Sequence, residues 1–207
     1  MDGTTYGFFL ATSLLIGAAP GPTTLLVLSH ALGRDPWRPA ALIAGAFCGN
    51  VVLVLVTVLG LSALIVASQT AFELLRWLGA GYLIYLGWRH WRAPALPVTA
   101  PGAARATAYG ALALQAAMTS MTNPKGLVFY LAFLPQFVTP GAGAGWQLGL
   151  LGASYVGVFV AVLAGYALAG RRLAYLFVTP RAMRLKNRLT GTFLIGAGPS
   201  LLRYERA

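Results

Sequence analysis

Residues 41–66 form a run of 26 residues without a charged side chain. About 20 mostly apolar residues suffice for a helix to cross the hydrocarbon core of a bilayer. The chain as a whole is 58% hydrophobic and 9% charged, whereas a soluble domain carries about 25% charged residues. It has too few polar side chains to cover a water-exposed surface, which predicts an integral membrane protein. The single cysteine, Cys48, excludes a disulfide-stabilised secreted scaffold.

Six apolar segments are candidate transmembrane helices and predict an all-α fold. They are residues 6–28, 41–66, 74–88, 109–137, 145–169 and 189–202. The first segment follows Asp2 rather than a basic region and is too long for the apolar part of a signal peptide, so we expect it to remain as a span. The third and sixth segments are short, which leaves open an alternative with five spans, one of these two lying at the interface.

Basic residues are concentrated in alternate loops between these segments. Eleven of the 15 Lys and Arg residues fall in the first, third and fifth loops, and none falls in the second or fourth. The positive-inside rule then places loops 1, 3 and 5 in the cytoplasm and, with six spans, both termini in the periplasm. The net charge of +11 is thus interpreted as a topology signal rather than as a nucleic-acid-binding surface.

The chain also resembles two copies of a three-span unit. At an offset of 111 residues, five positions are identical: Leu78/Leu189, Leu83/Leu194, Ile84/Ile195, Gly87/Gly198 and Arg92/Arg203. One transmembrane domain is therefore predicted, with repeats at about 1–93 and 106–207 and a basic cytoplasmic linker at about 93–106. An odd number of spans per repeat inverts the second copy, as in many secondary transporters. Chance similarity between Leu- and Gly-rich helices is the alternative.

Proline breaks are predicted in the first and fourth segments. Gly21 can cap a new half-helix that begins at Pro22, and Asn123 can cap one that begins at Pro124. Each half-helix start would present backbone N–H groups that suit a carboxylate. Plain proline kinks are the alternative, but two breaks in corresponding positions indicate a substrate site.

Polar residues near the breaks complete the predicted site. Lys125 is expected to face a cavity or a partner, because an ammonium in lipid is costly; snorkelling from a shallower position is the alternative. Thr23 and Asn50 are further candidates, although interhelical hydrogen bonds are the commoner role of such residues. Hydroxyls of Ser120 and its neighbours also lie near the second break. The predicted substrate-binding set is Pro20, Gly21, Pro22, Thr23, Asn50, Asn123, Pro124 and Lys125.

Other patterns limit the remaining functions. Gly45 and Gly49 have the spacing that lets two helices approach closely, and we expect this approach within one chain rather than between chains. No metal-ligand cluster, phosphate-binding loop or nucleophile–base set is visible, so no cofactor, metal or enzymatic activity is expected. No carboxylate is clearly placed in the middle of a span.

Three motifs in this order resemble the LysE/RhtB family of amino-acid exporters. They are Pro20-Gly-Pro22, the stretch Leu78-Gly-Ala-Gly-Tyr-Leu-Ile-Tyr-Leu-Gly-Trp88, and Asn123-Pro-Lys125 followed by Phe133-Leu-Pro-Gln-Phe137. The resemblance covers nearly the whole chain. It implies a multi-pass carrier of the bacterial inner membrane that exports amino acids or derivatives with the proton gradient. Thr23 departs from the Asp or Asn that many members carry after Pro-Gly-Pro.

The predicted function is therefore a secondary exporter of an amino acid or a close derivative. Its expected partners are the lipid bilayer and an amino-acid-like substrate, with no nucleic acid; a homo-oligomer is compatible with the sequence. One alternative is a carrier of the same architecture for another small solute, and another is a membrane-embedded subunit without transport activity. A thiol electron carrier is disfavoured, because dithiol exchange needs two cysteines.

Overall fold

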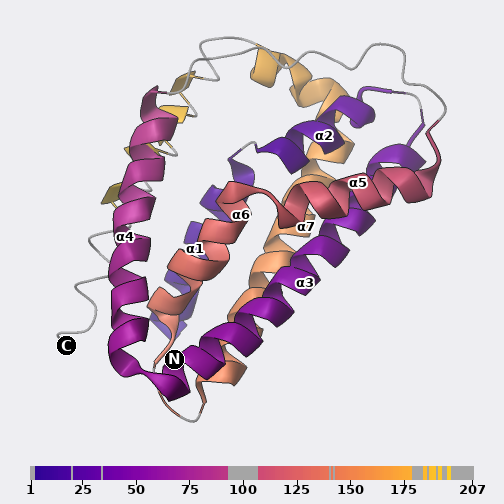
Figure 1. The fold of residues 1–207 in the computed structure, drawn as a ribbon. Helices are drawn as coiled ribbons and strands as arrows, with labels where there is room; N and C mark the ends of the chain where they lie inside the picture. Colours follow the sequence, from indigo (N-terminus) through magenta and orange to yellow (C-terminus); the bar gives the residue numbers. More distant parts are fainter. Residues whose placement is uncertain are drawn as a thin grey trace.

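The computed structural model describes residues 3–19, 21–33, 35–92, 107–139, 141, 143–178, 184, 185, 187–189, 191, 192, 195 and 196. Every regular element in this part of the chain is helical (Figure 1). The α-helices are α1 (Gly3–Ala18), α2 (Pro22–Ala31), α3 (Trp37–Ala67), α4 (Gln69–Arg92), α5 (Tyr109–Met121), α6 (Pro124–Val128) and α7 (Ala144–Val178). A π-helix, η1 (Phe129–Phe133), and a 3-10 helix, η2 (Leu134–Phe137), continue α6.

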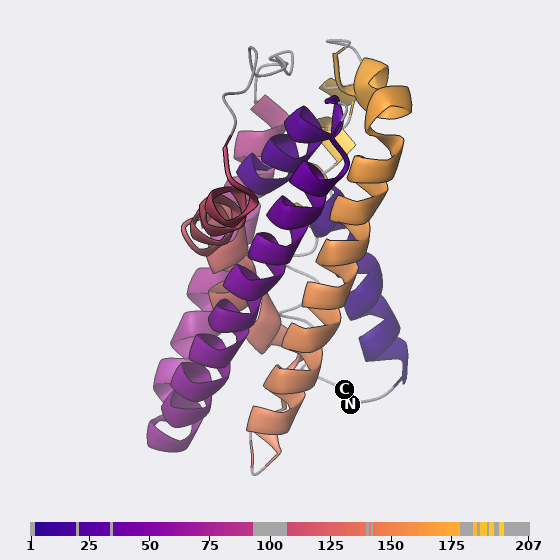
Figure 2. The same ribbon diagram turned by 90° about the vertical axis from the view of Figure 1, so that its right-hand side faces the viewer.

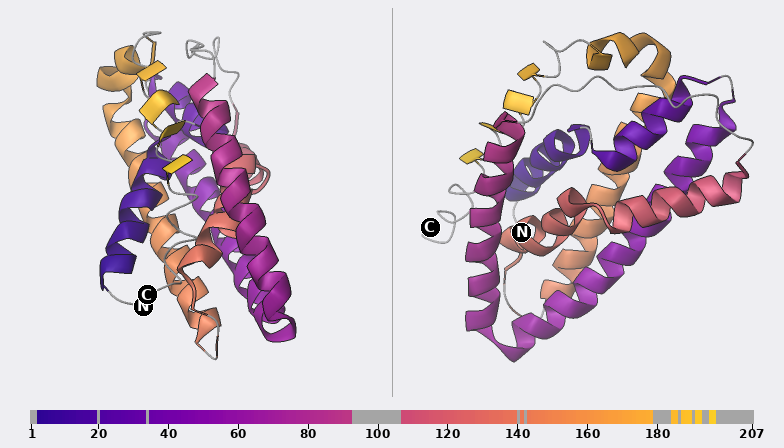
Figure 3. Two further views of the ribbon diagram at one scale, coloured as in Figure 1. Left: turned by 90° about the vertical axis from the view of Figure 1, so that its left-hand side faces the viewer. Right: turned by 45° about the horizontal axis from the view of Figure 1, so that its top comes forward.

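Two of these helices are long and apolar enough to cross a membrane by themselves. They are α3, over Trp37–Leu64, and α7, over Ala144–Ala169. The pair α1 and α2 meets the same requirement when taken together, with a bend of 61° between its two parts, which Figures 1 and 3 show. The first, second and fifth predicted segments therefore correspond to helical elements of suitable length and composition.

The other three predicted spans are not confirmed within the described residues. Helix α4 has 24 residues but carries charges at Glu73, Arg76, Arg89 and Arg92. The fourth segment is divided into α5, α6, η1 and η2, each shorter than a span. Most of the sixth segment and the whole predicted linker at 93–106 lie outside the described residues. The layout of six spans in two inverted repeats therefore stays a prediction.

Helix α3 packs closely on both α5 and α7, and Figure 2 shows α3 and α7 side by side. A Cβ atom added at Gly49 would lie 2.6 Å from the Ala117 carbonyl oxygen, and one at Gly45 would overlap the backbone of Ala113. On the other side of α3, a Cβ atom at Gly152 of α7 would lie 2.7 Å from Val54 Cγ1. The predicted use of the Gly45–Gly49 spacing within one chain is thus confirmed.

Aromatic side chains fill the space between α1, η1 and α7. Phe129 of η1 stacks on Tyr155 of α7, with ring centroids 3.6 Å apart. Phe9 of α1 contacts Phe133 and Phe137, with centroids 6.2 and 5.1 Å away. Phe9 and Phe133 are fully buried. This apolar cluster anchors α1 to the segment that follows the second proline break.

The described connections alternate between two ends of the helical bundle. In Figure 1 the α2–α3 connection, the end of α4 and the end of α7 lie at the upper end. The start of α1, the α3–α4 turn and the connection from η2 to α7 lie at the lower end. The odd-numbered predicted loops thus begin at one end of the molecule, as their shared basic character requires. Which end faces the cytoplasm stays a prediction.

Candidate functional site

The two predicted helix breaks are present, and their caps are those expected from the sequence. Gly21 is the N-cap of α2, with an extended backbone (φ −126°, ψ −177°), and Pro22 follows as the first helical residue. No side chain caps this start. Asn123 is the N-cap of α6, and its Oδ1 accepts a hydrogen bond from the Lys125 backbone N–H at 3.0 Å. The first turn of α2 therefore lacks the side-chain cap that the first turn of α6 has.

These two breaks, about 100 residues apart in the sequence, lie next to each other in space. A Cβ atom added at Gly21 would lie 3.5 Å from Asn123 Nδ2, 3.6 Å from Lys125 Cε and 3.7 Å from Lys125 Nζ. The buried hydroxyls of Thr23 and Ser120 lie 3.3 Å apart, in hydrogen-bonding contact. The start of α2 and the end of α5 are thus joined beside the meeting point.

Lys125 uses its ammonium group to bind the end of α1. Its Nζ donates to the carbonyl oxygen of Ile16 at 2.9 Å and to that of Ala19 at 2.6 Å. The last carbonyls of a helix lack helical N–H partners and carry partial negative charge. The partner of the Lys125 ammonium in this structure is therefore the carboxyl end of α1, on the other side of the first break.

Tyr166 of α7 supports the same end of α1. Its hydroxyl donates to the Ala18 carbonyl oxygen at 2.7 Å. Side chains from α6 and α7 thus bind three carbonyls of one helix terminus. The sequence gives no signal for this role of Tyr166, because a tyrosine in a long apolar helix is usually a packing residue.

The remaining predicted residues fall into three groups. Asn50 is 3% exposed; its Nδ2 donates to the Ala46 carbonyl at 2.8 Å, and its Oδ1 accepts from the Tyr130 hydroxyl at 3.2 Å. The bond to Ala46 lies within α3, and the bond to Tyr130 corresponds to the interhelical alternative rather than to a contact at the breaks. Pro22 and Pro124 are exposed, so they shape the backbone instead of lining a buried site. Pro20 lies outside the described residues.

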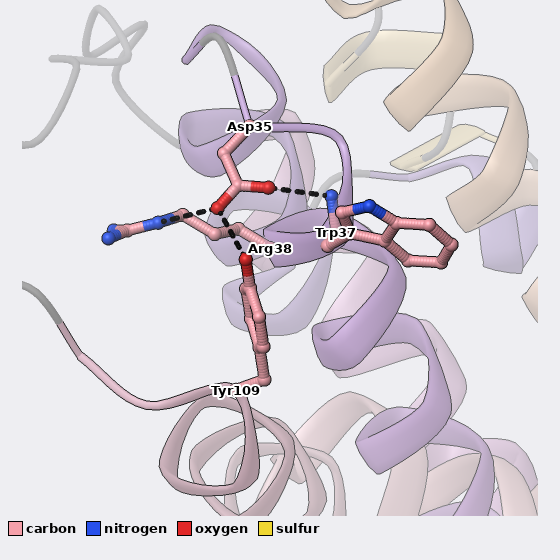
Figure 4. Close-up of polar contacts among 4 residues, drawn as sticks. All are labelled: Asp35, Trp37, Arg38 and Tyr109. Carbon is pink, nitrogen blue, oxygen red and sulfur yellow. Dashed lines mark hydrogen bonds and ion pairs between the residues drawn. The ribbon is translucent and has the colours of Figure 1, made fainter.

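A second polar cluster, centred on Asp35, lies on the surface at the upper end of the bundle (Figure 4). Its carboxylate accepts hydrogen bonds from the Trp37 backbone N–H and the Tyr109 hydroxyl, each at 3.0 Å, and pairs with Arg38 Nε at 3.4 Å. Partial desolvation raises the pKa of Asp35, but the hydrogen bonds from Trp37 and Tyr109 and the charge of Arg38 hold it below its ordinary value. The cluster ties the α2–α3 connection to the start of α5.

The sequence model of the family described as LysE type translocator matches residues 14–205 of this chain. The chain belongs to the LysE family of translocators.

Among the residues described here, no group of three His, Cys, Asp or Glu side chains gathers where it could hold a metal ion. The polar side-chain groups described at the meeting point of the two breaks are the Asn123 amide, the Thr23 and Ser120 hydroxyls and the Lys125 ammonium.

Named relatives in the LysE family extend over almost the whole chain. A homoserine/homoserine lactone efflux protein of Salmonella typhi is 34% identical over 199 residues, which cover 96% of each chain. A leucine efflux protein of Salmonella choleraesuis is 29% identical over 207 residues, 97% of this chain and 95% of the relative. A membrane protein of Vibrio cholerae is 31% identical over 198 residues, 96% of each. No solved structure matches the chain.

Proposed function

We propose that this LysE-family translocator is a secondary exporter of an amino acid or a close derivative across the bacterial inner membrane. The observation that carries the proposal is the meeting of two broken helices at Gly21, Asn123 and Lys125. Irregular backbone at membrane depth is tolerated where it lines a cavity or is buried in protein, and paired broken helices are a hallmark of transporter substrate sites. The relatives named as efflux proteins support the direction of transport.

The polar groups at the meeting point suit a carboxylate or a carbonyl oxygen. The first turn of α2, which has no side-chain cap, supplies backbone N–H groups with the positive end of a helix dipole. Asn123 Nδ2 and the Lys125 ammonium add two side-chain donors, 3.5 and 3.7 Å from the position that a Cβ atom would take at Gly21. The Oδ1 of Asn123 accepts from a backbone N–H, which fixes the orientation of its amide and leaves Nδ2 as the donor.

The names of the relatives narrow the chemistry that a shared site would recognise. Leucine and homoserine carry an α-ammonium and a carboxylate, whereas homoserine lactone keeps the amino group and a carbonyl oxygen but has no carboxylate. The features common to all three are the primary amine and the adjacent carbonyl oxygen. The proposed substrate class is therefore a small α-amino acid or α-amino carbonyl compound.

The proposed mechanism is alternating access between two inverted repeats of three spans, driven by the proton gradient. Both termini would lie in the periplasm, and the basic loops 1, 3 and 5 in the cytoplasm. Two packing relations support a pseudo-symmetric arrangement. Helix α3 of the first half packs on the broken segment of the second half, and α7 of the second half packs on α1 and α2.

Export from proteoliposomes tests the proposal directly. Vesicles containing the purified chain are loaded with single labelled amino acids, including leucine and homoserine, and with homoserine lactone. Efflux is measured with and without an imposed proton gradient. At least one of these solutes is expected to leave faster than from empty vesicles, and faster still with the gradient. Equal rates in protein-containing and empty vesicles for the whole panel would refute the proposal.

A further inference from the structure

The carboxyl end of α1 is a ready-made binding site for a cation with N–H donors. The carbonyls of Ile16, Ala18 and Ala19 gather where the helix stops, and each accepts a hydrogen bond from a side chain of another helix. A helix C-terminus carries partial negative charge, which favours a positive ligand. The end of α1 therefore offers both the acceptors and the field that an ammonium group needs.

We infer that these carbonyls are the subsite for the α-ammonium of the substrate, and that the Lys125 ammonium occupies this place until substrate arrives. The inference rests on the proposed function, because it assumes that an α-amino compound enters the meeting point of the breaks. Lysine and an α-amino acid present the same –NH3⁺ head with three N–H donors. The bonds from Lys125 Nζ to Ile16 and Ala19 are therefore those that a substrate ammonium would make.

The small number of carboxylates in this chain favours a subsite built from carbonyl oxygens. Only four acidic residues occur in the sequence: Asp2, Asp35, Glu73 and Glu205. Within the described part of the chain, no carboxylate pairs with Lys125, and Asp35 is engaged with Arg38 and Tyr109. Among the described residues, the acceptors that surround the Lys125 ammonium are the backbone carbonyls of Ile16 and Ala19.

The first break also places the negative carboxyl end of α1 beside the positive amino end of α2. The negative end of α1 binds Lys125 Nζ, which lies 3.7 Å from the Cβ position of Gly21 at the positive start of α2. A zwitterionic amino acid matches this arrangement, with its ammonium toward α1 and its carboxylate toward α2. Once displaced from α1, Lys125 is adjacent to that carboxylate and pairs with it.

Displacement of Lys125 also alters the contact between the two halves of the chain. In this structure its side chain links α6 to the end of α1 through two charge-assisted hydrogen bonds. Substrate takes over these acceptors and frees α6 from α1. Substrate binding thus breaks one connection between the two halves of the chain. A ligand can shift a conformational equilibrium only if its interactions differ between the two conformations, and this broken connection supplies such a difference.

The first test uses the fact that the chain has only two lysines, Lys125 and Lys186. The purified full-length protein is labelled with ¹³C at lysine Cε and examined by NMR, with Lys125→Arg used to assign the two signals. A saturating amount of the exported amino acid is expected to shift the Lys125 signal and to leave that of Lys186 unchanged. An unchanged Lys125 signal, in protein that exports this amino acid, would overturn the inference while leaving the proposed function intact.

The second test asks whether removing Lys125 vacates the subsite. Competition against the labelled amino acid is measured for its decarboxylated amine and for its deaminated carboxylic acid. In Lys125→Met the amine should bind at least about tenfold more tightly than in wild type, because an internal competitor is gone. The deaminated acid should bind more weakly, because its cationic partner is lost.

Arg38→Gln is the matched control, since it removes one positive charge away from the breaks and is expected to change neither competition. Lys125→Arg keeps a cation at the subsite and should keep the amine affinity near that of wild type. Unchanged or weaker binding of the amine to folded Lys125→Met would overturn the inference. If Lys125→Met does not fold, the NMR measurement on the wild-type protein decides the question alone.

Discussion

Gly49 of α3 provides a direct test of the packing that positions the site. A Cβ atom at Gly49 would lie 2.6 Å from the Ala117 carbonyl oxygen, whereas ordinary contact begins at about 3.4 Å. The obstacle is helix backbone, so in Gly49→Ala α5 must move away by about 0.8 Å, the difference between these distances. Overpacking of this kind costs about 1–3 kcal/mol. Because α5 ends at the second break, the displacement also disturbs Asn123.

Gly60→Ala is the matched control for this substitution, because it lies in the same helix and its Cβ would meet nothing within 4 Å. Each kcal/mol corresponds to about 2–4 °C in Tm for a chain of this length. Gly49→Ala should therefore melt roughly 2–12 °C below Gly60→Ala. Thermal unfolding of the purified proteins in detergent, followed by tryptophan fluorescence, measures the difference. Equal melting temperatures for the two variants would refute the close approach of α3 and α5.

Three further experiments test individual contacts. Because the pKa of Asp35 is lowered in the folded protein, its carboxylate stabilises the fold above the ordinary carboxyl pKa, and this stabilisation is lost as the pH falls through the lowered pKa. The Tm difference between wild type and Asp35→Asn should therefore be larger at pH 7 than at pH 3. Tyr166→Phe should lower the free energy of unfolding by about 1 kcal/mol through loss of the bond to α1, measured by denaturant titration. A double-mutant cycle with Asn50→Leu and Tyr130→Phe should give a coupling of about 0.6 kcal/mol, and zero coupling would contradict the hydrogen bond.

The helix breaks could be predicted because their causes are local. Proline lacks the N–H that a helix interior needs, and glycine and asparagine commonly cap helices. The pairs Gly21-Pro22 and Asn123-Pro124 therefore locate both half-helix starts. The corresponding positions of the two breaks in two halves of the chain indicate a substrate site, but that the breaks lie next to each other is known only from the structure. The close approach at Gly45 and Gly49 follows from spacing alone, because only glycine permits it.

The partners at the break could not be predicted, because they depend on the tertiary arrangement. Nothing near Tyr166 or Ala18 in the sequence indicates that the Tyr166 hydroxyl bonds the Ala18 carbonyl, 148 residues away. The sequence indicated that Lys125 needs a partner but not that the partner is a helix terminus. Asn50 has the same polarity as the break residues, yet its bonds go to Ala46 and Tyr130.

The central claim is that an amino-acid-like substrate is exported through the place where the two broken helices meet. The most direct measurement is efflux of the transported amino acid from proteoliposomes containing Asn123→Ala or Lys125→Ala. Arg38→Gln serves as control, because Arg38 pairs with Asp35 in the surface cluster away from the breaks. The account predicts that both site variants insert and fold but lose export, while the control exports at the wild-type rate. Wild-type export by folded Asn123→Ala and Lys125→Ala would contradict it.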